Sequence, residues 1–519
     1  MGVGEVSGAH RHTRMLNFND SLAWACTHPG DGHAHEVLAE AALASQNEAE
    51  ALPVVAAAAR RSVGNARLWH WTGLLHRALD DRVAAIRAFG AAVRFAPNDA
   101  RIAHGLARVL LEAGQPAITA FERARSLSPA DGDVVLGLYA AKLAAGEGDA
   151  AVRELDGLLA LNPGWVAGHN DLLHLRWMMG DQTAFVSSIE RSLMALPRHE
   201  ELWQLLLSTL VRGDRFDEAL AAVGRARKAL GERPFLIFNE AVIWSETESV
   251  AAADACFARM AKADDIEVAV RLVRHLLRNG RIDAAAKLVE RWIDVPDATP
   301  IWPYAAIVWR LAGDARFDWL EGQDGLIGVF DLAGELPPLA RLADMLRNLH
   351  QARFQHFNQS VRGGTQTDGA LLSRIEPEIR ELRAAIVAAT RSYIAGLPRA
   401  DPRHPTLSPR RDRIPRFSGS WSVRLQSRGF HANHVHPAGW LSSALYVALP
   451  QSMDRTDAQA GWLAIGEPQA ELGLALPAAQ LIEPKVGRLV IFPSTMWHGT
   501  RPFLDGERLT VAFDVQRPL

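Results

Sequence analysis

The 519-residue sequence has little cysteine and no excess of charge of either sign. Its two cysteines, Cys26 and Cys256, exclude a disulfide framework and any metal site built from several thiolates. So few cysteines are typical of a reducing compartment, and we expect a cytoplasmic protein. Lys and Arg total 56 against 59 Asp and Glu, a formal net charge of -3, so the charge balance indicates no nucleic-acid partner.

Long apolar runs are also missing. No stretch approaches the roughly 18 uninterrupted apolar residues of a membrane span, and the first fifteen residues lack the apolar segment of a secretory signal. We therefore expect no membrane association. The histidine-bearing start of the chain, residues 1–34, is typical of a flexible, solvated tail.

Residue usage changes along the chain, which predicts a multidomain protein. Ala/Leu/Arg-rich tracts fill the sequence before about Leu320, whereas Trp, Phe, Pro, Gly and His punctuate it after about Pro337. We place the boundary between Gly334 and Pro338. This gives a tail over 1–34, a helical domain over 35–335 and a second domain over 336–519.

A repeat of about 34 residues runs through the helical domain. Pro97, Pro129, Pro163 and Pro197 follow one another at steps of 32, 34 and 34 residues. Counting back from Pro97, the positions that carry the repeat signature are Trp69, Gly73, Ala85, Phe89 and Ala92. With this period and these residues, the sequence resembles the tetratricopeptide repeat family. The resemblance implies an all-α solenoid of antiparallel helix pairs, in divergent form beyond Arg233.

Such a solenoid presents an extended concave surface, which favours recruitment of a peptide or protein partner. The alternative is that the helices only brace the second domain or form a homo-oligomer. From about residue 35 to 330 we expect almost only helix, with the strands clustered after about residue 415.

The second domain changes from helical to strand-like patterning. The run from 375 to 397 reads as an amphipathic helix, and five later runs read as strands separated by turns: WSVRLQS, WLSSALYVAL, GWLAIG, RLVIFP and RLTVAFDV. This order predicts a small β-barrel or sandwich with helices outside. In VRGGTQT, the Gly363-Gly364 pair favours a turn or a lid, with Arg362, Gln366 and Thr367 as candidate lid residues.

Histidines gather at the end of one predicted strand. His434 and His436 are two residues apart, so on a strand both would project from one face, and His498 would complete a facial set of metal ligands from another strand. A pair formed by His431 and Asn433 would satisfy the same parity, although an amide is a poorer ligand. Arg508 follows His498 by ten residues.

The order His-x-His, His, Arg, together with motifs such as Leu441-Ser442, Phe492-Pro493 and Glu507-Arg508, resembles Fe(II)/2-oxoglutarate-dependent oxygenases from Pro338 to Leu519. The resemblance implies a double-stranded β-helix, or jelly roll, with flanking helices. It also implies Fe(II) on His434, His436 and His498, with 2-oxoglutarate and O₂ as cosubstrates. Arg508 would clamp the far carboxylate of 2-oxoglutarate, and the hydroxyls of Tyr446 and Thr510 would add hydrogen bonds.

One position departs from the wider superfamily, which has Asp where this sequence has His436. Three neutral imidazoles leave Fe(II) with a formal charge of +2 rather than +1, which should weaken metal binding and strengthen the attraction for a dianion. A three-histidine site also suits a cupin-type dioxygenase that needs no oxoacid.

From these features we expect a 2-oxoglutarate-dependent dioxygenase whose catalytic residues are His434, His436, His498 and Arg508. Its predicted substrate is a peptide or protein side chain, hydroxylated after recruitment by the repeats. Two other readings stay open at this stage. One is a helical-repeat scaffold with a catalytically silent barrel, and the other is an oxygenase that acts on a small metabolite.

Overall fold

The computed structural model describes residues 17–260, 264–295, 298–357, 359–450 and 457–518. Its internal contacts divide the chain into two compact units that meet between Leu138 and Tyr139. Among the described residues, no helix is both long and apolar enough to span a bilayer.

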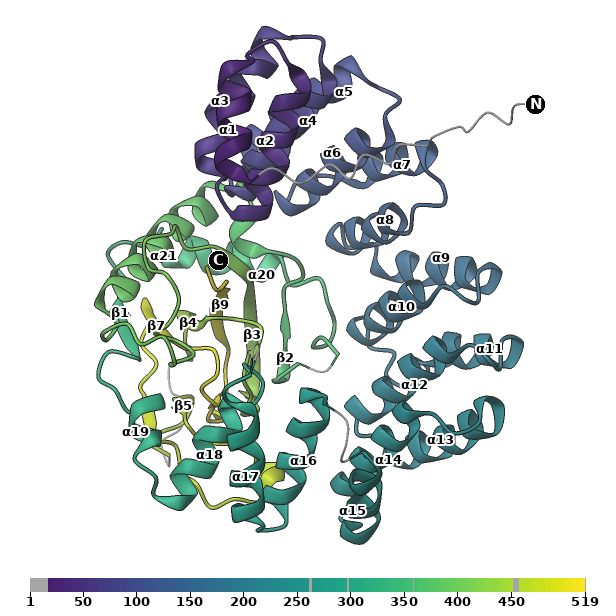
Figure 1. Ribbon diagram of the computed structural model, residues 1–519, viewed down its shortest axis with the longest axis vertical. Helices are drawn as coiled ribbons and strands as arrows, with labels where there is room; N and C mark the ends of the chain where they lie inside the picture. The colour runs from purple at the N-terminus through teal and green to yellow at the C-terminus, as the bar shows by residue number, and fades with distance from the viewer. Residues whose placement is uncertain (1–16, 261–263, 296–297, 358, 451–456, 519) are drawn as a thin grey trace, which may run out of the picture. The chain divides into compact units, whose positions relative to one another are not determined.

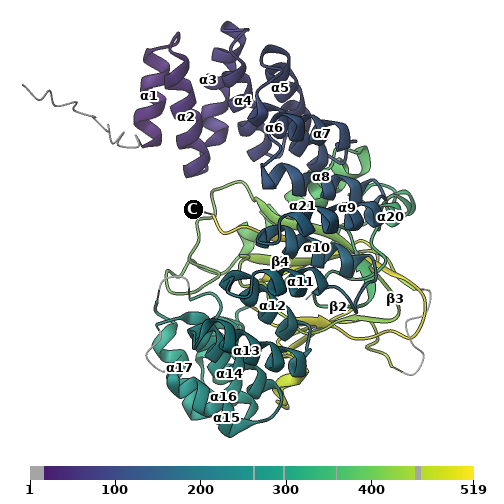
Figure 2. The ribbon, with the colours of Figure 1, turned by 90° about the vertical axis from the view of Figure 1, so that its right-hand side faces the viewer.

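The first unit consists of antiparallel helices that stack in chain order (Figure 2). Its helices are α1 (Phe18–Thr27), α2 (Gly32–Ser45), α3 (Glu48–Arg61), α4 (Ala66–Ala78), α5 (Arg82–Phe95), α6 (Ala100–Glu112), α7 (Ile118–Leu127) and the first part of α8 (Gly132–Ala144).

Glycines at the helix crossings of the repeats pack against buried aromatic rings. Phe89 is fully buried, and a Cβ added to Gly73 or Gly105 would lie 2.9 or 2.6 Å from its ring. Gly137 faces Phe121 in the same way, with a Cβ distance of 2.2 Å. Glycine is therefore required where neighbouring helices cross this closely. The solenoid is tetratricopeptide-like, as expected.

The structure differs from the tail predicted over 1–34. Residues 1–16 lie outside the described residues, but Phe18–Thr27 forms α1. The side chain of Asn17 caps this helix by accepting a hydrogen bond from the backbone N–H of Asp20, and Ala25 is buried in the first helical cluster. This N-cap is readable in the sequence, whereas the burial that holds the short helix in place is not.

The second unit contains the remaining helices and the strands (Figure 1). Its helices are the remainder of α8, α9 (Gly148–Leu161), α10 (Val166–Met178), α11 (Ser187–Ala195), α12 (Glu200–Arg212), α13 (Phe216–Leu230), α14 (Pro234–Glu246), α15 (Val250–Arg259), α16 (Ile266–Arg278), α17 (Ile282–Trp292), α18 (Trp302–Ala312), α19 (Arg316–Leu320), α20 (Leu339–Asn348) and α21 (Pro377–Gly396), with short 3₁₀ turns η1 (Leu371–Ser373) and η2 (Ala470–Leu472). We call α9–α18 the arm.

Two antiparallel sheets make up the C-terminal domain. The strands are β1 (Gly328–Asp331), β2 (Val361–Gln366), β3 (Phe417–His431), β4 (Leu441–Ala448), β5 (Leu463–Ile465), β6 (Gln480–Ile482), β7 (Arg488–Pro493), β8 (His498–Thr500) and β9 (Arg508–Val515). The larger sheet has the order β1-β7-β4-β9-β3-β2 and the smaller one β6-β5-β8. This arrangement is the expected jelly-roll type.

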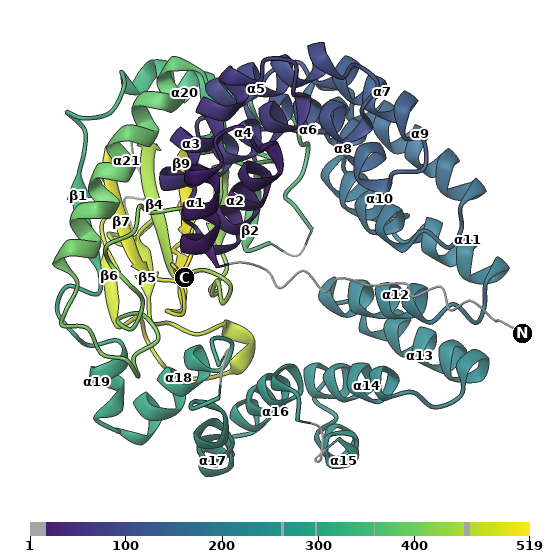
Figure 3. The ribbon, with the colours of Figure 1, turned by 45° about the horizontal axis from the view of Figure 1, so that its top comes forward.

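Helices α20 and α21 cover one face of the larger sheet (Figure 3). Leu342 on α20 and Ile386 on α21 share one hydrophobic cluster with Leu445 of β4 and Val511 of β9. Because side chains alternate along a strand, the residues between these apolar positions on β9 face the other side of the sheet. Those residues are Arg508, Thr510, Ala512 and Asp514.

Two strands lie earlier in the chain than predicted. β1 falls within the range assigned to the solenoid, yet it is an edge strand that pairs with β7. Val361–Gln366 is not a turn or a lid but β2, which pairs with β3 through a bulge between Arg362 and Gly364, and Thr367 follows directly after it. Gly363 has a φ of +70°, and a Cβ on Gly364 would lie 2.4 Å from the carbonyl oxygen of Arg424, so both glycines serve the bulge. Neither strand is long enough to give a clear alternating pattern.

The arm is fixed to the jelly roll by specific contacts. Arg274 of α16 donates to the side-chain oxygen of Gln469 at 2.7 Å, and Arg310 of α18 donates to the carbonyl of Gly466 at 2.8 Å. Trp497, next to His498 in the chain, donates its indole N–H to the carbonyl of Pro303 at 3.0 Å. The end of the arm therefore packs directly against the segments that carry the predicted ligands.

Candidate metal centre

The three predicted ligand histidines come together in the structure, although not by the strand parity that the sequence suggests. β3 ends at His431, and His434 then forms an isolated antiparallel bridge with His498 at the start of β8. The backbone N–H of His436 donates to the carbonyl of Ser494 at 2.9 Å. His434 and His436 therefore lie in the segment after the strand, each held by a different neighbour.

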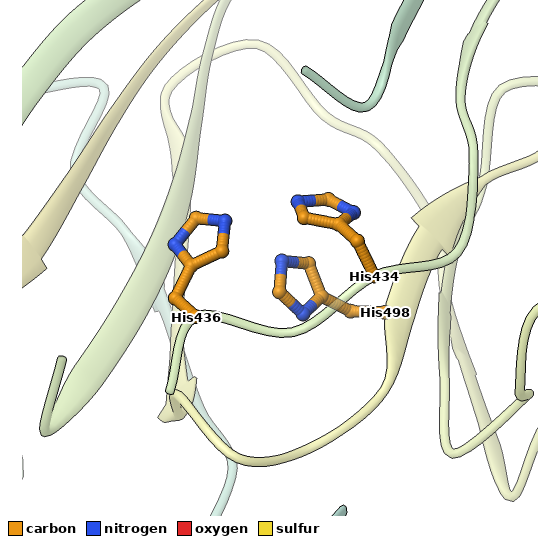
Figure 4. A group of neighbouring side chains, drawn as sticks. All are labelled: His434, His436 and His498. Carbon is orange, nitrogen blue, oxygen red and sulfur yellow. The ribbon is translucent and has the colours of Figure 1, made fainter. Parts of the chain in front are cut away.

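One ring nitrogen from each histidine contributes to a set whose members all lie within 4.8 Å of one another. The ring centroids of His434 and His498 are 4.2 Å apart, and those of His434 and His436 are 4.9 Å apart. The rings face a common space (Figure 4). This is the only such group of three or more potential metal ligands within the residues that the structure describes.

Hydrogen bonds fix which nitrogen of each ring is free. Nδ1 of His434 lies 2.8 Å from the carbonyl of Ala432, Nδ1 of His498 lies 2.9 Å from the carbonyl of Met496, and Nδ1 of His436 lies 2.8 Å from both carboxylate oxygens of Asp514. Each of these partners is an acceptor, so each Nδ1 carries the proton and donates. Nε2 of every ring is then an unprotonated lone pair, which is what a metal ion requires.

Electrostatics keep two of the rings neutral. Burial and, to a smaller extent, the neighbouring histidines lower the pKa of His498 to about 3 and that of His434 well below its ordinary value. Protonation would place positive charges side by side in a space with little water. The donor set of three neutral imidazoles fits Fe(II) and other borderline divalent metals.

His431 lies beside this set rather than in it. Its ring stacks on that of His434 with centroids 6.1 Å apart, and its Nδ1 is 3.1 Å from the hydroxyl of Ser360. The side chain of Asn433, which the alternative pairing would use as a ligand, instead donates through Nδ2 to the carbonyl of Pro468 at 3.0 Å. The structure thus gives neither His431 nor Asn433 a place in the ligand group.

Arg508 is buried at the start of β9 with 2% of its surface exposed. Its guanidinium donates to the carbonyl of Gly461 at 3.1 Å and lies 4.9 Å from the ring centroid of Tyr446. Among the described residues it has no carboxylate partner, and its Nε and the hydroxyl of Tyr446 have no hydrogen-bond partner. Burial lowers the pKa of Arg508, which reflects the cost of an uncompensated charge there.

Thr510 lies opposite both Val423 of β3 and Tyr446 of β4. Register partners share a face, so Thr510 and Tyr446 lie on the face of the sheet that carries Arg508. A buried cation on the same face of the sheet as two hydroxyl groups is suited to a carboxylate ligand. Arg508, Tyr446 and Thr510 therefore fit an oxoacid such as 2-oxoglutarate.

Two further polar residues at the centre were not predicted. Asp514 contacts His436, and the hydroxyl of Ser442 donates to Asp514 at 2.7 Å. Strand parity on β9 could have identified Asp514, since it shares a face with Arg508. Arg424 on β3 pairs with Glu507, and both side chains are partly exposed.

Comparisons with known proteins agree with the C-terminal fold. The sequence profile of a family described as "Putative 2OG-Fe(II) oxygenase" matches residues 419–514, a range that holds all three ligand histidines and Arg508. No curated protein matches the sequence.

Several solved structures are similar to part of the chain. YrrB, titled a TPR protein with an unusual peptide-binding site, is 15% identical over 36% of this chain and 96% of its own, with a TM-score of 0.28. MamA from Desulfovibrio magneticus RS-1 is 19% identical over 32% of this chain and 95% of its own, with a TM-score of 0.28. Yeast Tom70 is 13% identical over 60% and 67%, with a TM-score of 0.35. Residues 419–514 thus match the model of the 2OG-Fe(II) oxygenase family, and the helices that precede them in the chain form a tetratricopeptide-like solenoid.

Proposed function

We propose that the protein is a non-haem Fe(II) and 2-oxoglutarate-dependent dioxygenase that hydroxylates a peptide or protein side chain recruited by the helical repeats. The observation that carries the proposal is the pairing of three converging Nε2 atoms with a buried guanidinium that lacks a carboxylate partner among the described residues. The first group suits a divalent metal and the second suits an anionic cosubstrate.

His434, His436 and His498 would hold Fe(II) through Nε2, and Arg508 would pair with the far carboxylate of 2-oxoglutarate. The hydroxyls of Tyr446 and Thr510 would donate to the same carboxylate. When bound, iron and cosubstrate supply the oxidation, in which 2-oxoglutarate and O₂ become succinate and CO₂ while a C–H bond of the substrate becomes C–OH.

The protein itself contributes by holding the metal-ligating rings in fixed orientations. His498 is buried and the other two ligand histidines are half-buried, which limits the access of water to the reacting space. The Nδ1 hydrogen bonds set the direction of each Nε2. Phe492 packs against His498 with ring centroids 4.7 Å apart, which restrains that ring further. Trp421 lies 5.9 Å from His436 and forms an apolar wall beside it.

Contacts between the arm and the jelly roll support a large substrate. Gln469 and Pro468 belong to the β5–β6 connection, and they link Arg274 of the arm to Asn433, the residue before His434. A polypeptide held on the arm would thus be held close to the metal centre. A substrate that the pocket alone selects would need no such arm.

The burial of Arg508 also disfavours two alternatives, a catalytically silent barrel and a cupin-type dioxygenase. A silent barrel has no use for a buried, uncompensated Arg508, which is costly to retain. A cupin-type reaction without an oxoacid would leave that charge equally unused. We also propose that the protein works in the cytoplasm, in keeping with its scarce cysteines.

The direct test is cosubstrate turnover. Purified protein with Fe(II), O₂ and ascorbate should convert 2-oxoglutarate to succinate slowly, and faster when a true substrate polypeptide is present. Well-folded, iron-loaded protein that neither binds nor consumes 2-oxoglutarate would rule the proposal out.

A further inference from the structure

The metal centre contains one carboxylate that is not a ligand. Both oxygens of Asp514 lie 2.8 Å from Nδ1 of His436, whereas His434 and His498 direct Nδ1 at neutral backbone carbonyls. The three rings therefore differ in one respect. Only His436 donates to a formal negative charge.

The fold holds this carboxylate firmly. Asp514 lies between Phe513 and Val515, which are both fully buried in the core, so the backbone of β9 cannot shift without disturbing that core. Ser442, its register partner on β4, donates to Oδ1 at 2.7 Å. The hydroxyl of Ser494 lies 3.0 Å from that of Ser442 and continues the network.

Asp514 has no cationic partner other than His436 among the described residues, although its side chain is only 15% exposed. A largely buried carboxylate is stabilised by a nearby positive charge. A divalent ion on Nε2 of His436 would supply that charge through the ring, because the polarised imidazole transmits it to the Nδ1–H that the carboxylate accepts.

We propose that Asp514 is a positioning residue that fixes the orientation of His436 and supplies, one ring removed, the negative charge that a carboxylate ligand would otherwise bring to the metal. Ser442 holds the carboxylate in register. The inference rests on the proposed three-histidine centre and explains how a site of three neutral ligands retains its metal.

The test measures metal affinity separately from activity. The metal-free full-length protein is titrated with Co(II), whose binding is followed by visible absorption. Asp514→Asn keeps the shape and one hydrogen-bond acceptor but removes the charge, so it should weaken Co(II) binding by about 10- to 100-fold. Ser442→Ala should shift the affinity in the same direction by less.

Asp505→Asn is the matched control. Asp505 is an exposed aspartate of the same domain that bonds Ser427, so its loss changes the net charge equally without touching His436. This variant should bind Co(II) within about twofold of the unsubstituted protein, because exposed charges at a distance are screened.

A second readout separates charge from mere support of the fold. Co(II)-saturated Asp514→Asn should bind 2-oxoglutarate at least as tightly as the unsubstituted protein, because the centre is then one charge more positive. Equal Co(II) affinity in both proteins, or a parallel loss of metal affinity, 2-oxoglutarate affinity and melting temperature, would overturn the role of Asp514 alone. No Co(II) binding by the unsubstituted protein would overturn the three-histidine centre and this role with it.

Discussion

His434 and His498 exchange both of their backbone hydrogen bonds, each N–H donating to the other's carbonyl at 2.9 Å. The bridge joins the loop after β3 to β8 across 64 positions of sequence. It places the ring centroids of the two histidines 4.2 Å apart. The backbone bridge therefore restrains the positions of two of the three ligand histidines.

This preorganisation predicts metal-linked stabilisation. A divalent ion that binds the folded protein should raise its free energy of unfolding by about 2.7 kcal/mol at a concentration 100 times the dissociation constant. His498→Ala removes one ligand and should abolish both this stabilisation and 2-oxoglutarate turnover. Thermal unfolding with and without Co(II) measures the effect. Unchanged metal-dependent stabilisation in the variant would contradict the ligand assignment.

The buried histidines predict a pH dependence of the metal-free protein. The pKa of His498 is lowered to about 3 in the fold, against an ordinary value near 6.5 for the unfolded chain, and that of His434 is lowered in the same direction. Below pH 6.5 these two histidines are protonated in the unfolded state but stay neutral in the folded state. Stability is therefore fully present above pH 6.5 and is lost as the pH falls toward 3.

The window between pH 6.5 and 5 is the informative one, because most carboxylates titrate below it. Melting temperatures across that window should fall more steeply for the unsubstituted metal-free protein than for His498→Ala, which has one buried imidazole fewer. Parallel curves for the two proteins would show that His498 does not remain neutral in the fold.

Substitution of Arg508 should weaken the binding of 2-oxoglutarate without affecting the binding of the metal. Arg508→Lys keeps the charge but loses the planar fork, and Arg508→Ala loses both. A charge-assisted hydrogen bond contributes on the order of 1.5 to 3 kcal/mol, so the alanine variant should need at least about tenfold more 2-oxoglutarate. Co(II) binding by the same variants is the control and should persist. Normal 2-oxoglutarate dependence in Arg508→Ala would refute the clamp.

Much of this architecture could be predicted from the sequence because its signals are local. The proline rhythm and the Gly73–Phe89 packing reflect short-range helix crossing. The runs that form β4, β7 and β9 are recognisable because they are rich in apolar and β-branched residues. Short strands carry no such pattern. β1, β6 and β8 have three or four residues each and depend on neighbours far away in sequence.

In the site, too, local features could be predicted from the sequence and long-range contacts could not. His434, His436, His498 and Arg508 stand out by type and spacing, but the reason that the histidines converge is non-local. The sequence suggested one strand face, whereas the structure uses a bridge to β8 and a hydrogen bond to Ser494. Asp514 belongs to no motif, and strand parity places it only on the face of β9 that carries Arg508. Its role depends on which ring lies across from it.

The final prediction concerns the link between the arm and the metal centre. Phe357 is buried among arm residues, with its ring 5.0 Å from Trp177 and 5.5 Å from Phe185. Three residues later, the carbonyl of Ser360 accepts the backbone N–H of Ala432, two positions before His434. The packing of one aromatic ring thus anchors the strand that flanks the ligand loop.

Phe357→Ala should destabilise the second unit by about 3 to 5 kcal/mol, as expected for loss of a buried aromatic side chain. Since the anchor would be lost, the amide of Ala432 should exchange with solvent faster, and Co(II) binding should weaken by less than in His498→Ala. Phe354→Ala is the control, because Phe354 contacts the edge of Trp177 at 6.2 Å but lies outside the buried cluster. Hydrogen exchange at Ala432 that is equally fast in both variants, or unchanged in Phe357→Ala, would show that the arm and the metal centre are not coupled through this ring.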